Sequence, residues 1–107
     1  MAYEFMMLDG AQHDYEGIIE YLTTVANNPE PARAFADEFD RQIALVCENP
    51  NLYDLSRMPD LAALGYHAVF VGSYVVLCFF RQNTVFAAHV FHQRQDYARL
   101  AIRPKGM

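Results

Sequence analysis

The densest cluster of reactive side chains in this sequence lies in the run His92-Gln93-Arg94-Gln95-Asp96-Tyr97. An imidazole can transfer protons near neutral pH, a guanidinium can bind an anion, and a phenol can stack or donate a hydrogen bond. The run follows an apolar segment of strand length, and a strand end is a place where a rigid scaffold presents such groups together. This run is therefore the first candidate for a functional site. In the alternative structural role, His92 caps the strand end through a backbone hydrogen bond and Tyr97 covers the sheet edge.

A second histidine, in the motif His89-Val90-Phe91-His92, gives a spacing that can be mistaken for a metal site. Residues three apart in a strand point to opposite faces, so these two rings cannot chelate one ion. Cys47 and Cys78 are far apart in sequence and match neither a disulfide scaffold nor a structural zinc pattern. We expect the site to use neither a metal nor another cofactor.

Two helices are predicted in the N-terminal half. After a short strand within residues 1–8, an apolar stripe at helical spacing covers residues 11–26, with Asp9 and Gln12 as the expected cap. The prolines in residues 27–31 end this helix and start a second stripe over residues 32–47, so the two form an antiparallel hairpin. Gly17 lies inside the first stripe at a cost of about 1 kcal/mol relative to Ala. We expect it to mark a close helix contact.

The C-terminal half has the character of a β-sheet. Residues 51–64 lack a clean period and are predicted to be a loop with room for one helical turn. Beyond it, residues 66–71, 74–81 and 85–92 are rich in Val, Phe, Tyr and Leu, which predicts three strands in a meander. The expected fold is α+β in the order β-α-α-β-β-β. Its helical hairpin packs on one face of a mostly antiparallel sheet and its tail from residue 93 is polar and basic.

The turn at Gly72-Ser73 sets the expected register of the sheet. It pairs Val71 with Tyr74 and, counting back, His67 with Cys78. An even-length loop before residue 85 then places Ala87, His89 and Phe91 on the same face. The opposite face is the more uniformly apolar, so we predict that the helices cover it. Its expected members are Phe70, Val75, Leu77, Phe79, Phe86, Ala88 and Val90.

Length and charge limit the kinds of protein that this chain can be. Its 107 residues are 53% apolar, which fits one domain over residues 1–107. The net charge of −5 disfavours a non-specific nucleic-acid coat, but residues 1–60 carry twelve acids and three bases whereas residues 61–107 carry one acid and five bases. A polyanion partner should therefore meet the C-terminal half. We expect neither a signal peptide nor a membrane span, and a cytoplasmic location.

Several short motifs together resemble the RelE/ParE superfamily of toxins from bacterial type II toxin-antitoxin modules. They are the helical run Gly17-Ile18-Ile19-Glu20-Tyr21-Leu22, the strand entry Gly65-Tyr66, the hairpin Gly72-Ser73-Tyr74 and the closing run from Val90 to Tyr97. The similarity extends through nearly the whole chain, and the order of the motifs carries most of it.

The resemblance implies a small cytoplasmic toxin that a cognate antitoxin holds inactive. In RelE-like members the activity is metal-independent cleavage of mRNA on the ribosome, an endoribonuclease reaction that needs an acid, a base and a cation. On that comparison His92 would be the acid or base, Arg94 would bind phosphate and Tyr97 would contact a base. His67, Arg81 and Arg99 would be secondary RNA or phosphate contacts. We predict mRNA cleavage as the first hypothesis.

Two alternatives stay open. ParE-like members inhibit DNA gyrase without a catalytic set, which fits the valine at position 75, where RelE-like nucleases commonly carry an Arg, and the single lysine, Lys105. A non-toxic family member would be a binding module. Both faces of the expected sheet are largely apolar, and two helices cannot cover both of them. We therefore predict a partner on the remaining face: an amphipathic antitoxin segment over the sheet or helix surface, or a second copy in a homodimer. The acids Asp37, Glu38 and Asp40 offer a basic antitoxin segment a place to bind.

Overall fold

The computed structural model describes residues 3–49 and 59–102 and gives the element order β-α-α-α-β-β-β-α. The helices and strands are β1 (Glu4–Met7), α1 (Asp9–Ala26), α2 (Glu30–Glu48), α3 (Pro59–Ala63), β2 (His67–Val71), β3 (Tyr74–Arg81), β4 (Thr84–His92) and α4 (Tyr97–Ile102). The predicted α+β fold is confirmed. The single helical turn expected within residues 51–64 is α3, and the short helix α4, in the expected tail, is an addition.

The four strands form one mixed sheet in the order β1-β4-β3-β2. β1 runs parallel to β4, and the other neighbouring pairs are antiparallel. The hairpin between β2 and β3 has the predicted register, with Val71 opposite Tyr74 and His67 opposite Cys78. Gly72 makes this two-residue turn possible, because its φ of +58° is a conformation that side chains with a Cβ rarely adopt.

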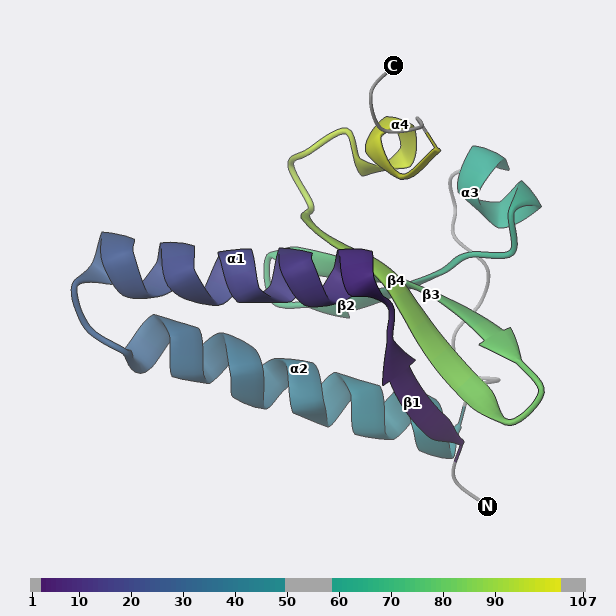
Figure 1. Ribbon diagram of the computed structural model, residues 1–107, viewed down its shortest axis with the longest axis horizontal. Coiled ribbons are helices and arrows are strands. Elements are labelled where there is room, and N and C mark those ends of the chain that lie inside the picture. The colour runs from purple at the N-terminus through teal and green to yellow at the C-terminus, as the bar shows by residue number, and fades with distance from the viewer. Residues whose placement is uncertain (1–2, 50–58, 103–107) are drawn as a thin grey trace.

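The α1–α2 hairpin and the pair α3 and α4 cover opposite faces of the sheet (Figure 1). The prediction for the long helices is wrong, because they pack on the face of Val69, Val76 and Cys78 rather than on the face of Val75 and Leu77. The set of residues that we expected to leave uncovered is therefore mostly buried beneath the hairpin: Val69, Val71, Val76, Phe80 and Val85 belong to or pack against that core.

A β-bulge in β4 explains why the faces of the last residues of this strand were also predicted wrongly. Cys78 faces Ala87, but its neighbour Leu77 faces His89, so Ala88 is an extra residue in the ladder. One inserted residue exchanges the two faces for everything that follows it. Val90 therefore turns toward the long helices, whereas His89 and Phe91 turn toward the opposite face.

The start of α1 and its glycine also differ from expectation. The N-cap is Leu8 and no side chain caps this end, while Gln12 donates a hydrogen bond to Glu16 at 2.9 Å instead of reaching back. Gly17 is not at a close helix contact, since a Cβ built there meets nothing within 4 Å. Neither residue therefore has the structural role that its position in the sequence predicted.

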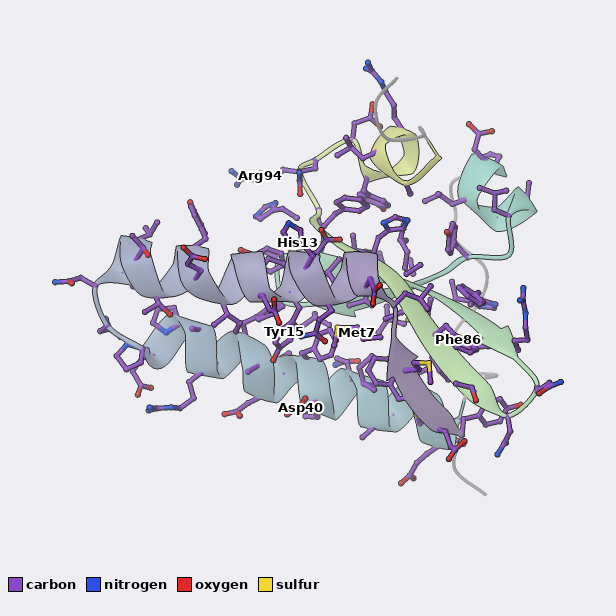
Figure 2. The ribbon with its side chains drawn as sticks, in the orientation of Figure 1. Met7, His13, Tyr15, Asp40, Phe86 and Arg94 are labelled. Atoms are coloured by element: carbon purple, nitrogen blue, oxygen red, sulfur yellow. The ribbon has the colours of Figure 1, made fainter. Side chains whose placement is uncertain are left out.

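Aromatic rings hold the hairpin together over the sheet. Tyr15 of α1 lies 4.8 Å from Phe39 and 5.5 Å from Phe35, both of α2, and Phe35 lies 5.0 Å from Tyr74 of β3, measured between ring centroids. Burial, with the nearby carboxylates of Asp40 and Asp37, raises the pKa of the Tyr15 phenol. Figure 2 shows Tyr15 between α1 and α2 and Asp40 on α2.

Candidate functional site

The candidate site begins where β1 ends and α1 takes its place beside β4. β1 pairs with β4 only as far as Ala87, so the next backbone groups of β4 need other partners. The Leu8 N–H donates to the Ala87 carbonyl at 2.9 Å, and the Val90 N–H donates to the Asp14 carboxylate at 3.0 Å. These bonds fix α1 alongside the last part of β4.

A groove runs between α1 and this end of β4. It has a volume of about 560 Å³ and is open to solvent. Its walls carry two imidazoles, two phenols, a carboxylate and an amide among apolar groups. The lining residues are His13, Asp14, Gly17, Ile18, Tyr21, Tyr74, Val90, Phe91, His92 and Gln95.

His92 is held at the groove by the turn that follows it. The backbone N–H of Arg94 donates to His92 Nδ1 at 3.0 Å, and the backbone N–H of His92 donates to Gln95 Oε1 at 2.8 Å. Because Nδ1 accepts, the proton of the neutral ring lies on Nε2. The outer nitrogen is thus arranged to donate a hydrogen bond, and the role of His92 in closing the strand end is confirmed, with an amide rather than a carbonyl as its partner.

Gln93 ties the same turn to the neighbouring hairpin. Its backbone N–H donates to the Ser73 carbonyl at 2.9 Å, and its Nε2 donates to the Gly72 carbonyl at 2.8 Å. The His92 ring also lies edge-on to the Tyr74 ring, with centroids 5.1 Å apart. Position and orientation of the imidazole are therefore determined by contacts from the turn after β4 and from the β2–β3 hairpin.

On the same side of the groove as His92, Tyr74 lines the space opposite α1. Partial burial, followed by the proximity of Tyr21, raises the pKa of the Tyr74 phenol, so it stays protonated at neutral pH and can donate a hydrogen bond. Arg94 is exposed on the turn before α4, and Figure 2 shows it on the side of α1 from which His13 projects. The side of the groove formed by β3 and β4 therefore carries hydrogen-bond donors, His92 and Tyr74.

Tyr97 does not join His92 at the groove. It is 8% exposed and belongs to an apolar cluster with Leu61, Val75 and Leu77, on the face of the sheet that α3 and α4 cover. His92 lies on the other face, beside Tyr74. The structure thus brings His92 and Arg94 together on one turn and packs Tyr97 away from them, as the lid on the sheet that was the alternative.

The secondary residues lie apart from the groove. His67 stacks on Phe80 at 4.4 Å on the side of the long helices, and not on the outer face that we predicted. Arg81 lies 5.4 Å over the Phe79 ring, seven residues along β3 from Tyr74, which is about 23 Å in a strand. Arg99 is exposed on α4.

The described residues carry neither a metal-binding cluster nor a helix able to span a membrane. His89 and His92 point to opposite faces, as predicted for this motif. Residues 3–49 and 59–102 contain no group of three or more His, Cys, Asp or Glu side chains placed to hold a metal. In the same ranges no helix has the length and apolarity needed to span a membrane. Arg103 and Lys105, the basic residues that follow the candidate run, lie outside these ranges.

Sequence reasoning missed the α1 side of the groove. His13, Gly17 and Tyr21 follow one another at four-residue spacing and so share a helix face, a signal that was available. The apolar stripe through Ile18 and Leu22 predicts only one face of α1 with a partner. Contact between this second face and β4 depends on where β1 ends, which apolar spacing does not reveal.

Comparison with known proteins gives a family match and two similar structures. Residues 6–97 match the family model described as the ParE toxin of the type II toxin-antitoxin system parDE. The fold is similar to a chain of the chromosomal ParDE toxin-antitoxin system from P. aeruginosa, with a TM-score of 0.67 and 13% identity over 85% of this chain and 96% of that one. It is also similar to a chain of the toxin-antitoxin complex RelBE2 from Mycobacterium tuberculosis, with a TM-score of 0.56 and 16% identity over 86% and 99%. No curated protein sequence matches.

Proposed function

This chain belongs to the ParE family and is the toxin of a type II toxin-antitoxin system, and from that premise we propose that it stops growth by binding DNA gyrase rather than by cutting mRNA. We propose further that it acts in the cytoplasm and that an antitoxin neutralises it. The toxin-antitoxin assemblies in which the two similar structures occur support the second point.

The observation that carries the proposal is the separation of the three candidate catalytic groups. RNA cleavage through the 2′-hydroxyl needs an acid, a base and a cation around one phosphate. Tyr97 is packed beneath the sheet on the far side from His92, and the one ring nitrogen of His92 that lacks a proton is occupied by the Arg94 amide. An arrangement of this kind favours binding over proton transfer.

Two further features support a binding toxin. Val75, at the position where RelE-like nucleases commonly carry an arginine, is fully buried under α3 and α4. Cations are also few: Arg81, Arg94 and Arg99 are the described Lys or Arg residues of the C-terminal half, and the first of them is far from the other two along the sheet. Affinity for a polyanion increases with each phosphate neutralised, so this surface favours a protein target.

Induction in the absence of the antitoxin tests the proposal. We expect growth arrest with induction of the DNA-damage response, and relief of the arrest when both gyrase subunits are overproduced. Unrelieved arrest together with mRNA 5′ ends at fixed codon positions would contradict it. Normal growth on induction would instead mark a binding module that has lost toxicity.

A second candidate function is the mRNA cleavage that the sequence predicted, and one observation favours it. The His92 imidazole and the Arg94 guanidinium lie on the same turn, next to an open groove. If this function is the real one, His92→Ala combined with Arg94→Ala abolishes the codon-linked cuts, and Tyr97→Phe leaves them, because the buried phenol takes no part.

A further inference from the structure

We propose that the groove between α1 and β4, continued along α1 by Tyr21 and Val25, is the docking surface for an apolar and basic segment of the antitoxin. We call this surface the α1 stripe and define it by Gly17, Tyr21, Val25, Tyr74 and His92. The inference rests on the proposed function and adds to it the place and the chemistry of neutralisation.

Gly17 has no role that contacts within the described chain explain. It lies in the interior of an 18-residue helix, where glycine is about 1 kcal/mol less favourable than alanine. A Cβ at Gly17 would meet no heavy atom within 4 Å, whereas one at Gly10 would lie 3.5 Å from the Ala88 carbonyl oxygen. Because Gly17 lines the groove, its missing side chain exposes helix backbone to which a second chain can approach closely.

Apolar side chains continue from this glycine along one line of α1. Gly17, Tyr21 and Val25 are four residues apart, so their side chains lie one above another. Tyr21 is 60% exposed and Val25 is 65% exposed, the two largest fractions among the large apolar residues of the described chain. An exposed apolar line that leads out of a groove is typical of a surface on which a partner helix or strand lies.

Charge identifies the chemistry of the partner. α1 carries Asp9, Asp14, Glu16 and Glu20 and no Lys or Arg, and the first basic residue of the chain is Arg33. Asp14 accepts the Val90 N–H, whereas Glu16 and Glu20 lie on the exposed flank of the stripe. A second copy of this chain would bring two acidic helices together and is disfavoured. A segment with apolar side chains and Lys or Arg beside them is complementary.

The test uses the full-length toxin and the small protein encoded by the reading frame beside its gene. Gly17→Leu fills the groove, and Gln12→Leu places the same side chain on the exposed outer side of α1 as a matched control. We expect Gly17→Leu to weaken binding of that protein at least tenfold while the thermal midpoint of the toxin stays the same or rises. Gln12→Leu should bind like the wild type. Exchange of Glu16 and Glu20 for Gln should flatten the dependence of the Kd on salt.

The growth assay separates this inference from the proposed function. Gly17→Leu should still stop growth but escape neutralisation by the co-expressed protein. Wild-type affinity for the Gly17→Leu variant overturns the inference. So does a variant that keeps this affinity and loses toxicity, because the stripe would then serve the target. A wild-type chain that binds the neighbouring protein and leaves growth unaffected contradicts the proposed function alone, since the affinity comparison can still be made.

Discussion

The two faces of the sheet are closed in very different ways. On one face, helices of 18 and 19 residues cover a cluster of thirteen buried residues. On the other, helices of five and six residues cover a cluster of four, centred on Leu61, Val75, Leu77 and Tyr97. Helices this short are unstable in isolation, so α3 and α4 depend on their contacts with the sheet.

The residues that stabilise the fold and the surface proposed to bind the antitoxin lie in different parts of the molecule. The face under the long helices holds the fold together, and the groove that carries the proposed antitoxin site is at its margin, where α1 passes the end of β4. We expect the face under α3 and α4 to open without loss of the whole structure, because short helices and a small cluster close it.

The largest effect is expected for Phe39→Ala in the first cluster. Phe39 is 3% exposed and its ring lies within 6.2 Å of the rings of Phe5 in β1, Tyr15 in α1 and Phe35 in α2, so truncation removes packing that joins these three elements. We expect the free energy of unfolding to fall by about 3–5 kcal/mol. Urea unfolding followed by circular dichroism measures it, and a loss below about 1 kcal/mol would contradict the account.

A smaller and local effect is expected for Leu61→Ala in the second cluster. Leu61 is fully buried, but it lies on a five-residue helix that can shift to fill part of the cavity left by truncation. We therefore expect the free energy of unfolding to fall by about 2 kcal/mol. Amide exchange should quicken in α3 and α4 and not in α2.

The thiol of Cys78 reports whether that opening stays local. Burial, chiefly, raises the pKa of Cys78 to about 12, and the residue lies in the first cluster. Iodoacetamide should therefore label Cys78 no faster in the Leu61→Ala variant than in the wild type, but faster in Phe39→Ala. Equal acceleration in both variants would mean that the two faces open together.

An intermediate effect is expected where α1 is fixed to β4. Asp14→Ala removes the acceptor of the Val90 N–H, a hydrogen bond to a charged group, and should destabilise the fold by about 1.5 kcal/mol. Asp14→Asn keeps an acceptor and should recover part of the loss. Glu20→Ala, an exposed position on the same helix, is the control and should change the unfolding free energy little.

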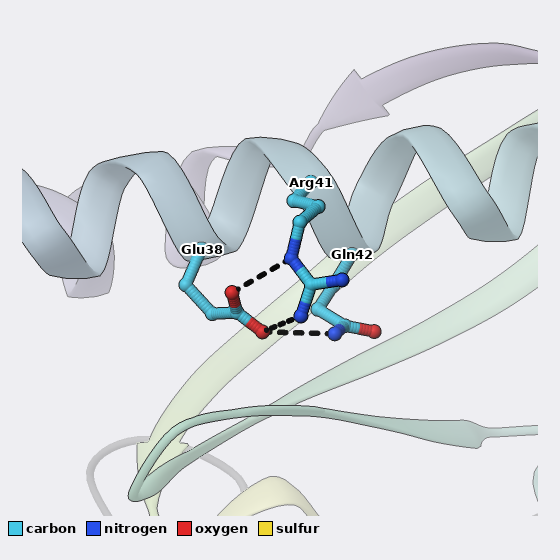
Figure 3. A network of polar contacts seen from close by, with 3 residues as sticks. All are labelled: Glu38, Arg41 and Gln42. Carbon is cyan, nitrogen blue, oxygen red and sulfur yellow. Dashed lines mark hydrogen bonds and ion pairs between the residues drawn. The ribbon is translucent and has the colours of Figure 1, made fainter.

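The smallest effect is expected on the exposed side of α2. Glu38 accepts two hydrogen bonds from Arg41, at 2.9 and 2.7 Å, and one from Gln42 at 2.9 Å (Figure 3). These contacts, the bond from Arg41 first, lower the pKa of the Glu38 carboxyl. Because the folded pKa is the lower one, the contribution is present above the unfolded pKa and is lost as the pH falls through the folded pKa.

Carbon-detected NMR titration of Glu38 measures this shift. Its midpoint should be below that of an exposed glutamate and should return toward the ordinary value in Arg41→Ala. The thermal midpoint at pH 7 should scarcely change in that variant, because an exposed ion pair contributes little to stability. A large drop would mean that this side of α2 is more important to the fold than its exposure indicates.

The sequence alone predicts the strands, the two long helices and the register of the β2–β3 hairpin. The alternation of Val, Phe and Tyr set the strands, and the need for a glycine in a tight turn set the pairing of Val71 with Tyr74. The sequence did not predict which face of the sheet the long helices cover, because the extra residue Ala88 leaves no trace in the spacing of apolar residues. The more uniformly apolar face was also expected beneath the long helices, but the two short helices α3 and α4 bury it with few residues.

The candidate site was predictable only in part. His92 and Arg94 follow a strand end, where sequence reasoning placed them, and their catalytic roles stay predictions. Tyr97 and Ala101 are four residues apart in α4 and pack into the second cluster, a helical pattern hidden by the polar residues before it. The α1 side of the groove depends on β1 ending at Met7, a tertiary fact that no local spacing encodes.

A supercoiling assay with purified toxin and gyrase tests the proposed inhibition of gyrase. We expect the toxin, without antitoxin, to block supercoiling of relaxed plasmid by gyrase or to trap cleaved DNA, and Tyr97→Phe to do so as well as the wild type. Undiminished supercoiling at a large excess of toxin, from a preparation that cuts mRNA on ribosomes, would contradict it.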